Sequence, residues 1–209
     1  MKTIYTLFFY FLYFTCEAQI RAVSDEGEEV ILNSNGSWSY LNPKENLKVT
    51  TSKIKFYKSD DCNDSIKSNR NKVAIHFNSN KWNFKKSKNK SAEIDFSLRK
   101  FKKIQAILLT EKTRVNVDTL AKFSIMNAKI NSQNPVIIKE REYRIVNDNV
   151  VLYVKYFTKI KDIAFNYWAY YHSGEDGSTQ FLVASPEPIS LEDEKSIKEL
   201  LNGFILLEN

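Results

Sequence analysis

The side chains that could catalyse a reaction or hold a metal are scarce in this chain. Two histidines and two cysteines occur among 209 residues, with no His-x-x-His or Cys-x-x-Cys spacing. A zinc site needs three or four nitrogen or sulfur ligands, which His76, His172 and Cys62 alone hardly supply. We therefore expect no metal and no cofactor. We interpret His76 as a strand residue facing solvent and His172 as a strand end before a turn.

Cys62 is the remaining candidate nucleophile, and it lies in the acidic stretch 60–64. Neighbouring carboxylates raise the pKa of a thiol and suppress the reactive thiolate, which argues against a Cys–His dyad. The same stretch resembles part of a calcium loop, but counting from Asp61 places Ile66 at the glycine position and Lys72 at the glutamate position. A looser calcium contact is the remaining alternative. Since Gly-x-Ser-x-Gly, P-loop and nucleotide fingerprints are also missing from the sequence, we predict no catalytic residues.

The start of the chain has the parts of a secretory signal peptide. Lys2 supplies a positive charge, residues 4–14 an apolar run, and Cys16 and Ala18 the small residues before a cut. The run is shorter than the roughly 20 residues that span a bilayer. We expect cleavage after Ala18 and export to the periplasm or the extracellular space. Lipoprotein processing at Cys16 is the alternative, disfavoured by the bulky residues just before it.

Export limits the partners and the redox chemistry of the mature chain. An exported protein rarely meets nucleic acid or nucleotide cofactors, so we expect an unknown protein or an envelope component as the partner. Cleavage after Ala18 also removes Cys16, leaving Cys62 without an internal disulfide partner. A hydrophobic content of 43% and an aromatic content of 13% are globular values. Stability must therefore come from packing.

The net charge of +6 is concentrated in residues 81–103, which hold nine basic and two acidic side chains. One interpretation is a solvated, lysine-rich hairpin rim, with Trp82 and Phe84 alternating into the core. The other is a contact for an anionic surface such as lipid headgroups, polysaccharide or an acidic partner. The candidate contact residues are Lys81, Lys85, Lys86, Lys88, Lys90, Lys100, Lys102 and Lys103.

The chain divides into segments of different character. After the signal peptide at 1–18, residues 19–41 contain three β-prone runs separated by two turn signals, one of them Asn-Gly, and predict a small β-meander. Residues 42–72 are polar and are expected to form a linker or arm. Residues 73–209 form the main domain, with strands expected at 73–77, 92–98, 104–109, 136–146, 150–157, 163–171 and 179–184.

Two helices are expected among these strands. One lies around 117–128 with Asp118 as a cap. The other closes the chain, because Ser190 and Asp193 form a variant of the capping box and Gly203 supplies a stop. Its apolar stripe consists of Ile197, Leu200, Leu201 and Phe204.

Four stretches occur in an order that points to a known family: 74–77 with Trp82 close behind, the helix at 117–128 before two strands, the aromatic run 162–171 leading through a glycine turn into 180–183, and the closing helix. This order resembles the Mog1/PsbP-like family, although its usual Pro-Gly before the tryptophan is replaced. The resemblance implies an α+β fold, a largely antiparallel twisted sheet flanked by helices, preceded here by the β-meander. It also implies a non-catalytic binding or assembly role and carries over no functional residues.

Residues 20–41 separately look like the small hairpin module at the N-terminus of many exported bacterial proteins, which brings no activity with it. The leading hypothesis is an exported binding or envelope-assembly protein without chemistry of its own. A surface adhesion module, touching the membrane or polysaccharide through residues 81–103, is the second. An unrecognised hydrolase is the third.

Overall fold

The computed structural model describes residues 20–23, 29–32, 36–40 and 49–207. The chain divides into two compact units, residues 1–47 and 48–209, which are described separately. The expected signal peptide lies outside the described residues, so cleavage after Ala18 stays a prediction.

The N-terminal unit contains a three-stranded antiparallel sheet in the order β1-β2-β3. The strands are β1 (Ile20–Val23), β2 (Glu29–Leu32) and β3 (Trp38–Tyr40). Gly36, between β2 and β3, has a φ of 81°, a left-handed conformation that glycine adopts without steric cost. The three strands lie in the segment from which the meander is expected.

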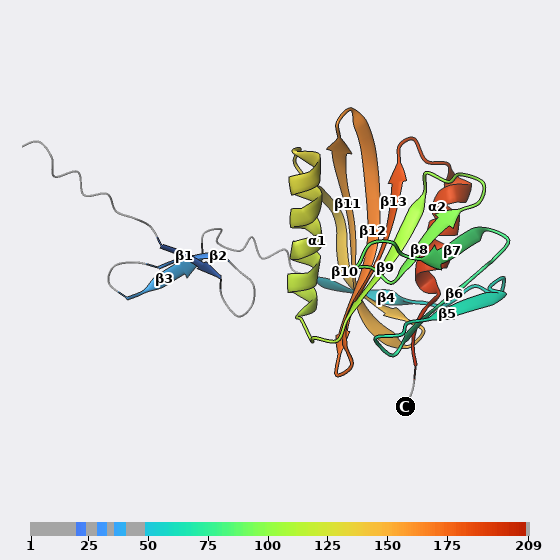
Figure 1. Ribbon diagram of the computed structural model, residues 1–209, viewed down its shortest axis with the longest axis horizontal. Helices are drawn as coiled ribbons and strands as arrows, with labels where there is room; N and C mark the ends of the chain where they lie inside the picture. Colours follow the sequence, from blue (N-terminus) through green and yellow to red (C-terminus); the bar gives the residue numbers. More distant parts are fainter. Residues whose placement is uncertain (1–19, 24–28, 33–35, 41–48, 208–209) are drawn as a thin grey trace, which may run out of the picture. The chain divides into compact units, whose positions relative to one another are not determined.

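The main unit is built on an eight-stranded sheet in which the β4–β10 pair is parallel and every other neighbouring pair is antiparallel (Figure 1). This architecture confirms the α+β class with a largely antiparallel sheet. In spatial order the strands are β4 (Thr50–Phe56), β10 (Ile137–Val146), β11 (Asn149–Ile160), β12 (Ile163–Gly174), β13 (Gly177–Pro186), β9 (Gln105–Glu111), β8 (Ile94–Leu98) and β7 (Trp82–Lys86).

One face of this sheet, here called the α2 face, carries the larger core. It is covered by α2 (Leu191–Asn202) and by a second sheet of β14 (Phe204–Leu206), β6 (Val73–Phe77) and β5 (Asp64–Lys67). Ser190 caps α2, its hydroxyl oxygen accepting from the backbone N–H of Asp193 at 3.1 Å, as the sequence predicts. A Cβ on Gly203 would lie 1.8 Å from the carbonyl oxygen of His76, so only glycine lets the chain turn there into β14.

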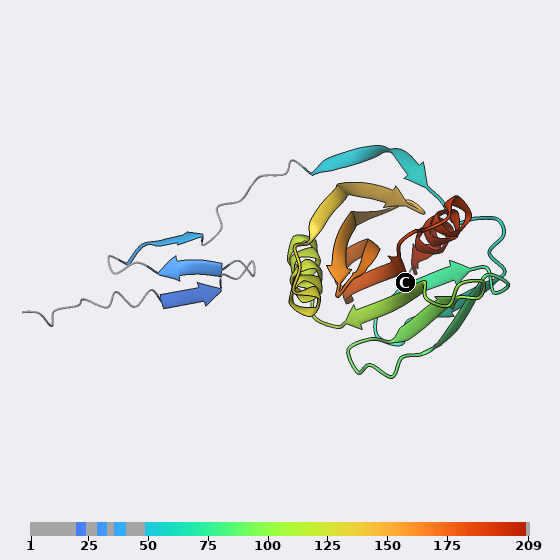
Figure 2. The ribbon, with the colours of Figure 1, turned by 90° about the horizontal axis from the view of Figure 1, so that it is seen from above.

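The opposite face, here called the α1 face, is covered by α1 (Val117–Ser132), which packs on β11 and β12. Figure 2 shows the two helices on opposite sides of the sheet. The N-cap of α1 is Asn116 rather than the expected Asp118: the Asn116 side chain accepts from the backbone N–H of Asp118 at 2.8 Å. Asp118 instead forms an ion pair with Arg141 of β10. Because both faces are covered over β12, Trp168 and Tyr171 on its two sides are both buried, as expected.

The expectation of a linker or arm over residues 42–72 is wrong where β4 and β5 form. Most side chains of these two strands are exposed, so they lack the apolar alternation by which a strand is recognised. Backbone pairing holds both strands: β4 pairs with β10, which is distant in the sequence, and β5 pairs with its neighbour β6. The closing helix stops at Gly203, as expected, but Phe204, which the sequence assigns to its apolar stripe, begins β14 and packs in the same core.

Candidate functional site

A groove of about 470 Å³ opens on the α1 face of the sheet, over β7, β8, β9 and β13. α1 packs chiefly on β11 and β12, so it leaves this part of the sheet uncovered. Residues of these strands that point to the α2 face, such as Leu108 and Phe181, belong to the larger core. Because strand side chains alternate, their sequence neighbours face the groove.

Strand register arranges the groove side chains in two rows across the sheet. The first row runs through the Cα partners Lys85, Asp95, Ile107 and Leu182. The second row runs through Asn83, Ser97, Gln105, Ala184 and Tyr167. Both rows therefore change from polar at β7 and β8 to apolar at β13 and β12. Lys102, in the loop between β8 and β9, adds a second cation to the lining.

The apolar end of the groove is a fixed surface. Ile107, Leu182 and Ala184 are half-buried there. The ring of Tyr167 stacks on that of Tyr156, with centroids 4.8 Å apart and planes 8° from parallel. Burial raises the pKa of Tyr167, which keeps its hydroxyl neutral. A ligand would meet an aliphatic floor bordered by a preorganised aromatic ring.

The polar end carries positive charge that no described residue compensates by an ion pair. The side chains of Lys85 and Lys102 are exposed and make no ion pair or hydrogen bond with the described part of the chain. Asp95 is the single acidic residue in the lining and lies directly across from Lys85, yet no ion pair joins the two. The lining thus has two cationic groups and one anionic group.

The other candidate lysines of the 81–103 segment fall into two groups, those paired with α2 and those exposed outside the groove. Lys81 pairs with Glu199 at 2.7 Å and Lys100 with Glu192 at 2.6 Å, so both are engaged by α2 on the opposite face. The four that remain are exposed and lie outside the groove lining: Lys86, Lys88, Lys90 and Lys103. Of the eight candidate contacts, Lys85 and Lys102 are the pair that the fold brings to one cavity.

Trp82 and Phe84, which alternate with these lysines, do not have the same environment. Trp82 is 2% exposed and belongs to the larger core, whereas Phe84 is 43% exposed. The Phe84 ring still packs edge-on against Phe77, with centroids 5.4 Å apart. The expected alternation into the core therefore holds fully for Trp82 and in part for Phe84.

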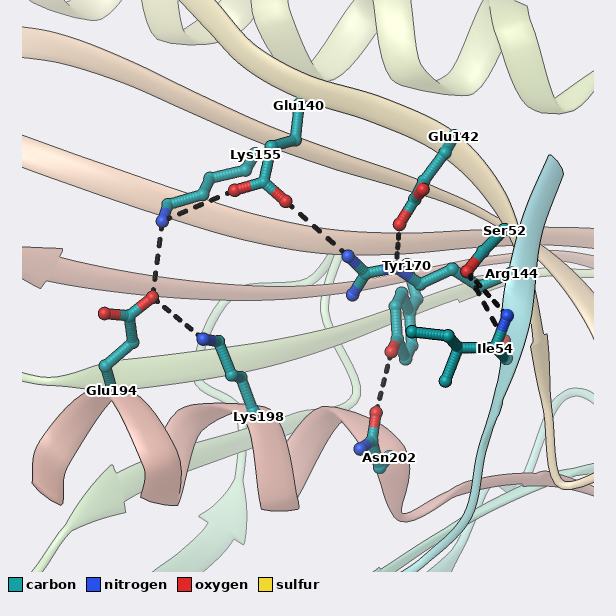
Figure 3. A network of polar contacts seen from close by, with 10 residues as sticks. All are labelled: Ser52, Ile54, Glu140, Glu142, Arg144, Lys155, Tyr170, Glu194, Lys198 and Asn202. Atoms are coloured by element: carbon teal, nitrogen blue, oxygen red, sulfur yellow. Dashed lines mark hydrogen bonds and ion pairs between the residues drawn. The ribbon is translucent and has the colours of Figure 1, made fainter. Parts of the chain in front are cut away.

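A second cluster of charged side chains lies on the α2 face, and no pattern in the sequence indicates it (Figure 3). Arg144 of β10 is largely buried, and its guanidinium stacks on the ring of Tyr153 at 3.3 Å and on that of Phe56 at 4.5 Å. Its Nε donates to the carboxylate of Glu142 at 2.6 Å, and Glu140 lies 3.6 Å away. Burial alone would lower the pKa of Arg144, but the bond to Glu142 raises it.

Lys155 of β11 extends this network to α2. Its Nζ lies 3.3 Å from Glu194, 3.7 Å from Glu140 and 5.3 Å from the centroid of Trp168. Lys198 also pairs with Glu194, at 3.2 Å. Three basic and three acidic side chains thus neutralise one another between the sheet and α2. Because each charge already has a partner, the network fits a structural role in holding α2 to the sheet.

The histidines and Cys62 are not brought together in a catalytic arrangement. His76 lies on β6 and His172 on β12, and burial lowers the pKa of both. The pKa of Cys62 is raised, chiefly by burial, while Glu199 and Asp61 contribute less. The sequence thus predicted the direction of this shift but not its main cause. Among the described residues, no group of three His, Cys, Asp or Glu side chains could hold a metal ion.

Neither helix in the described part of the chain combines the length and apolar character needed to cross a bilayer. Comparison of the sequence with protein-family models finds no match, and comparison with curated proteins finds none either. The relationship to known proteins is therefore visible through the fold.

Among solved structures, the fold is similar to the solution structure of cyanobacterial PsbP (CyanoP) from Synechocystis sp. PCC 6803. The TM-score is 0.54 with 10% sequence identity, over 68% of this chain and 91% of that one. The chain has a PsbP-like fold. A crystal structure from Bacteroides thetaiotaomicron VPI-5482 is similar at a TM-score of 0.46 and 9% identity, over 69% of this chain and 48% of that one. The PsbP-like fold confirms the resemblance inferred from the order of strands, aromatic residues and helices.

Proposed function

We propose that this chain is an exported, non-catalytic binding protein of the bacterial envelope, and that the groove on the α1 face is its binding site. The signal-peptide pattern supports export. The PsbP-like fold supports a binding or assembly role, because that is what the family resemblance implies. The groove itself carries the proposal: it combines an apolar floor, a preorganised tyrosine ring and two cations that have no counter-ion among the described residues.

The chemistry of the lining favours binding over hydrolysis. Hydrolases that work with carboxylates use a pair of them in distinct protonation states, whereas the groove lining contains Asp95 alone. Neither His76 nor His172 belongs to the lining. A ligand in the groove would therefore meet groups that orient it but no nucleophile paired with a base.

A second candidate function is adhesion to an anionic surface through the lysines outside the groove. Lys86, Lys88, Lys90 and Lys103 are exposed and have no ion pair with a described residue. Such a contact would be screened within about 8 Å at physiological ionic strength. Binding through these lysines should thus weaken steeply with salt and should not depend on the shape of the groove.

The test is an affinity capture from the organism's own envelope extract, using the full chain produced with its own leader. Ala184→Trp fills the groove, whereas the variant Lys86→Gln/Lys103→Gln changes nearby charge without touching its lining. We expect a bound component to be retained by the unmodified chain and by the lysine variant, and to be lost from Ala184→Trp. Retention by Ala184→Trp together with loss from the lysine variant would instead support adhesion.

Export has its own test. The mass of the chain recovered from the envelope fraction should correspond to a start at Gln19, the residue after the predicted cut. An acylated species starting at Cys16 would show lipoprotein processing instead. An uncleaved chain in the cytoplasm would contradict the proposed location.

A further inference from the structure

The two ends of the groove differ in chemistry, one apolar and one positively charged, and this difference indicates the class of ligand that fits. Its β12 and β13 end presents aliphatic and aromatic surface from Tyr167, Leu182 and Ala184. Its β7 end presents Lys85, and Lys102 stands in the loop that follows β8. A ligand that uses both ends must therefore have an apolar part and a charged part in one molecule.

We infer that the groove binds a small amphipathic anion, with its apolar chain along Tyr167, Leu182 and Ala184 and its anionic head at Lys85 and Lys102. This inference rests on the proposed function, because it names the ligand class of the same site. A volume of about 470 Å³ lies within the range of roughly 300–1,000 Å³ that is typical of small-molecule sites.

Charge complementarity sets the sign of the head group. The lysines in the 81–103 segment that meet an acidic partner, Lys81 and Lys100, do so through α2 on the opposite face. Lys85 and Lys102 have no such partner among the described residues. The anion of the ligand would take that place. Asp95 opposes it, so removing this carboxylate should tighten binding rather than weaken it.

Three polar side chains near the head are compatible with an anion. Asn83, Ser97 and Gln105 form the polar part of the second row, between the lysines and the apolar floor. They can donate hydrogen bonds to carboxylate or phosphate oxygens. A carboxylate and a phosphate head share this chemistry, so both classes of head are tested.

The experiment is a calorimetric titration of the full chain with octanoate, octyl phosphate and octyltrimethylammonium. We expect both anions to bind saturably and the cation to bind at least about tenfold more weakly. Hexanoate, octanoate and decanoate should gain up to about fourfold in affinity per buried methylene until the apolar floor is filled. The ratio between octanoate and octyl phosphate identifies which head the site prefers.

Matched variants locate the binding. Lys85→Gln/Lys102→Gln should weaken octanoate on the order of tenfold, about two- to fivefold for each lysine, whereas Lys86→Gln/Lys103→Gln removes the same charge and should leave the affinity unchanged. Asp95→Asn should strengthen octanoate binding about two- to fivefold. In methyl-selective spectra, the shifts caused by octanoate should centre on Ile107, Leu182 and Ala184.

Equal affinities for octanoate and octyltrimethylammonium would overturn the inference, as would equal losses in the two lysine variants or no binding of either anion. These results are separable from failure of the proposed function. If Ala184→Trp loses the captured envelope component while octanoate does not bind, the groove is a binding site for a different class of ligand. If Ala184→Trp retains the component, the proposed site itself is wrong.

Discussion

Charged side chains have opposite environments at two places on the eight-stranded sheet, the network beneath α2 and the groove on the α1 face. On the α2 face, Arg144 and Lys155 are surrounded by carboxylates and aromatic rings, and each charge has a partner within 4 Å. On the α1 face, Lys85 and Lys102 stand at an open groove without a counter-ion among the described residues. The difference follows from solvation: a charge removed from water needs a partner, while an exposed charge does not.

The paired charges beneath α2 stabilise the fold, whereas the unpaired charges at the groove are accessible to a ligand. A buried guanidinium without its carboxylates would cost several kcal/mol, so the network on the α2 face leaves nothing for a partner to neutralise. The groove lysines are exposed to solvent, which hydrates their charges, and in our proposal a ligand anion takes the place of that hydration. Charged residues of the same type thus have different roles because of where the sheet places them.

The largest effect should come from breaking the network at its centre. Arg144→Ala removes the guanidinium from between Tyr153 and Phe56 and leaves Glu142 without its partner. We expect the free energy of unfolding to fall by about 3 kcal/mol. Urea denaturation measures this loss, and Arg144→Lys should recover part of it by restoring the charge. A loss below about 1 kcal/mol would contradict the structural role assigned to the network.

A smaller loss of stability should distinguish Glu93 from Asp95, two acidic residues close together in the sequence. Glu93 is 7% exposed and accepts hydrogen bonds from the hydroxyls of Ser68 and Thr110, each at 2.7 Å, and from the backbone of Asn69. Glu93→Gln should cost about 1–2 kcal/mol of stability. Asp95→Asn, in the groove, should change stability by less than about 0.5 kcal/mol. Equal losses of stability in Glu93→Gln and Asp95→Asn would contradict the distinction between paired and unpaired charges.

The pH dependence of the free energy of unfolding should reveal the contribution of Glu93. Burial alone would raise the pKa of Glu93, but the hydrogen bonds from Thr110, Ser68 and Asn69, with Arg70 nearby, lower it below its ordinary value of 4.5. A lowered pKa in the folded state stabilises the protein fully above pH 4.5, and this contribution is lost as pH falls through the folded-state pKa. The stability difference between the unmodified chain and Glu93→Gln should therefore shrink below pH 4.5. A difference that grows with acidity would refute this assignment.

The smallest effect should come from the groove lysines. Lys85→Gln/Lys102→Gln should leave the free energy of unfolding unchanged within about 0.5 kcal/mol, because neither lysine has an ion pair to lose among the described residues. The same double variant weakens octanoate binding in our proposal. A large loss of stability would mean that these lysines, like Arg144, belong to the structural framework.

Local patterns in the sequence predict the framework well where burial is strong. The strands β8 and β13 and the capped helix after Ser190 carry their own signals, namely period-2 alternation, a capping residue and an apolar stripe. β4 and β5 carry no such signal, since most of their side chains are exposed; backbone pairing, with Phe56 and Ile66 packed against the core, holds them in place. The Asn116 cap was also missed, because Asp118 two residues later is an equally good capping residue by type.

The sequence by itself determined the classes of chemistry to expect, the order of most strands and helices, and a concentration of positive charge at 81–103. Only the tertiary structure decided which of those charges remain available. Lys81 and Lys100 meet α2 through partners 118 and 92 residues later in the chain. Lys85 and Lys102 face the side of the sheet that α1 leaves open. The physical reason is that strand alternation is local, whereas the partner of a charge depends on register and on which element covers each face.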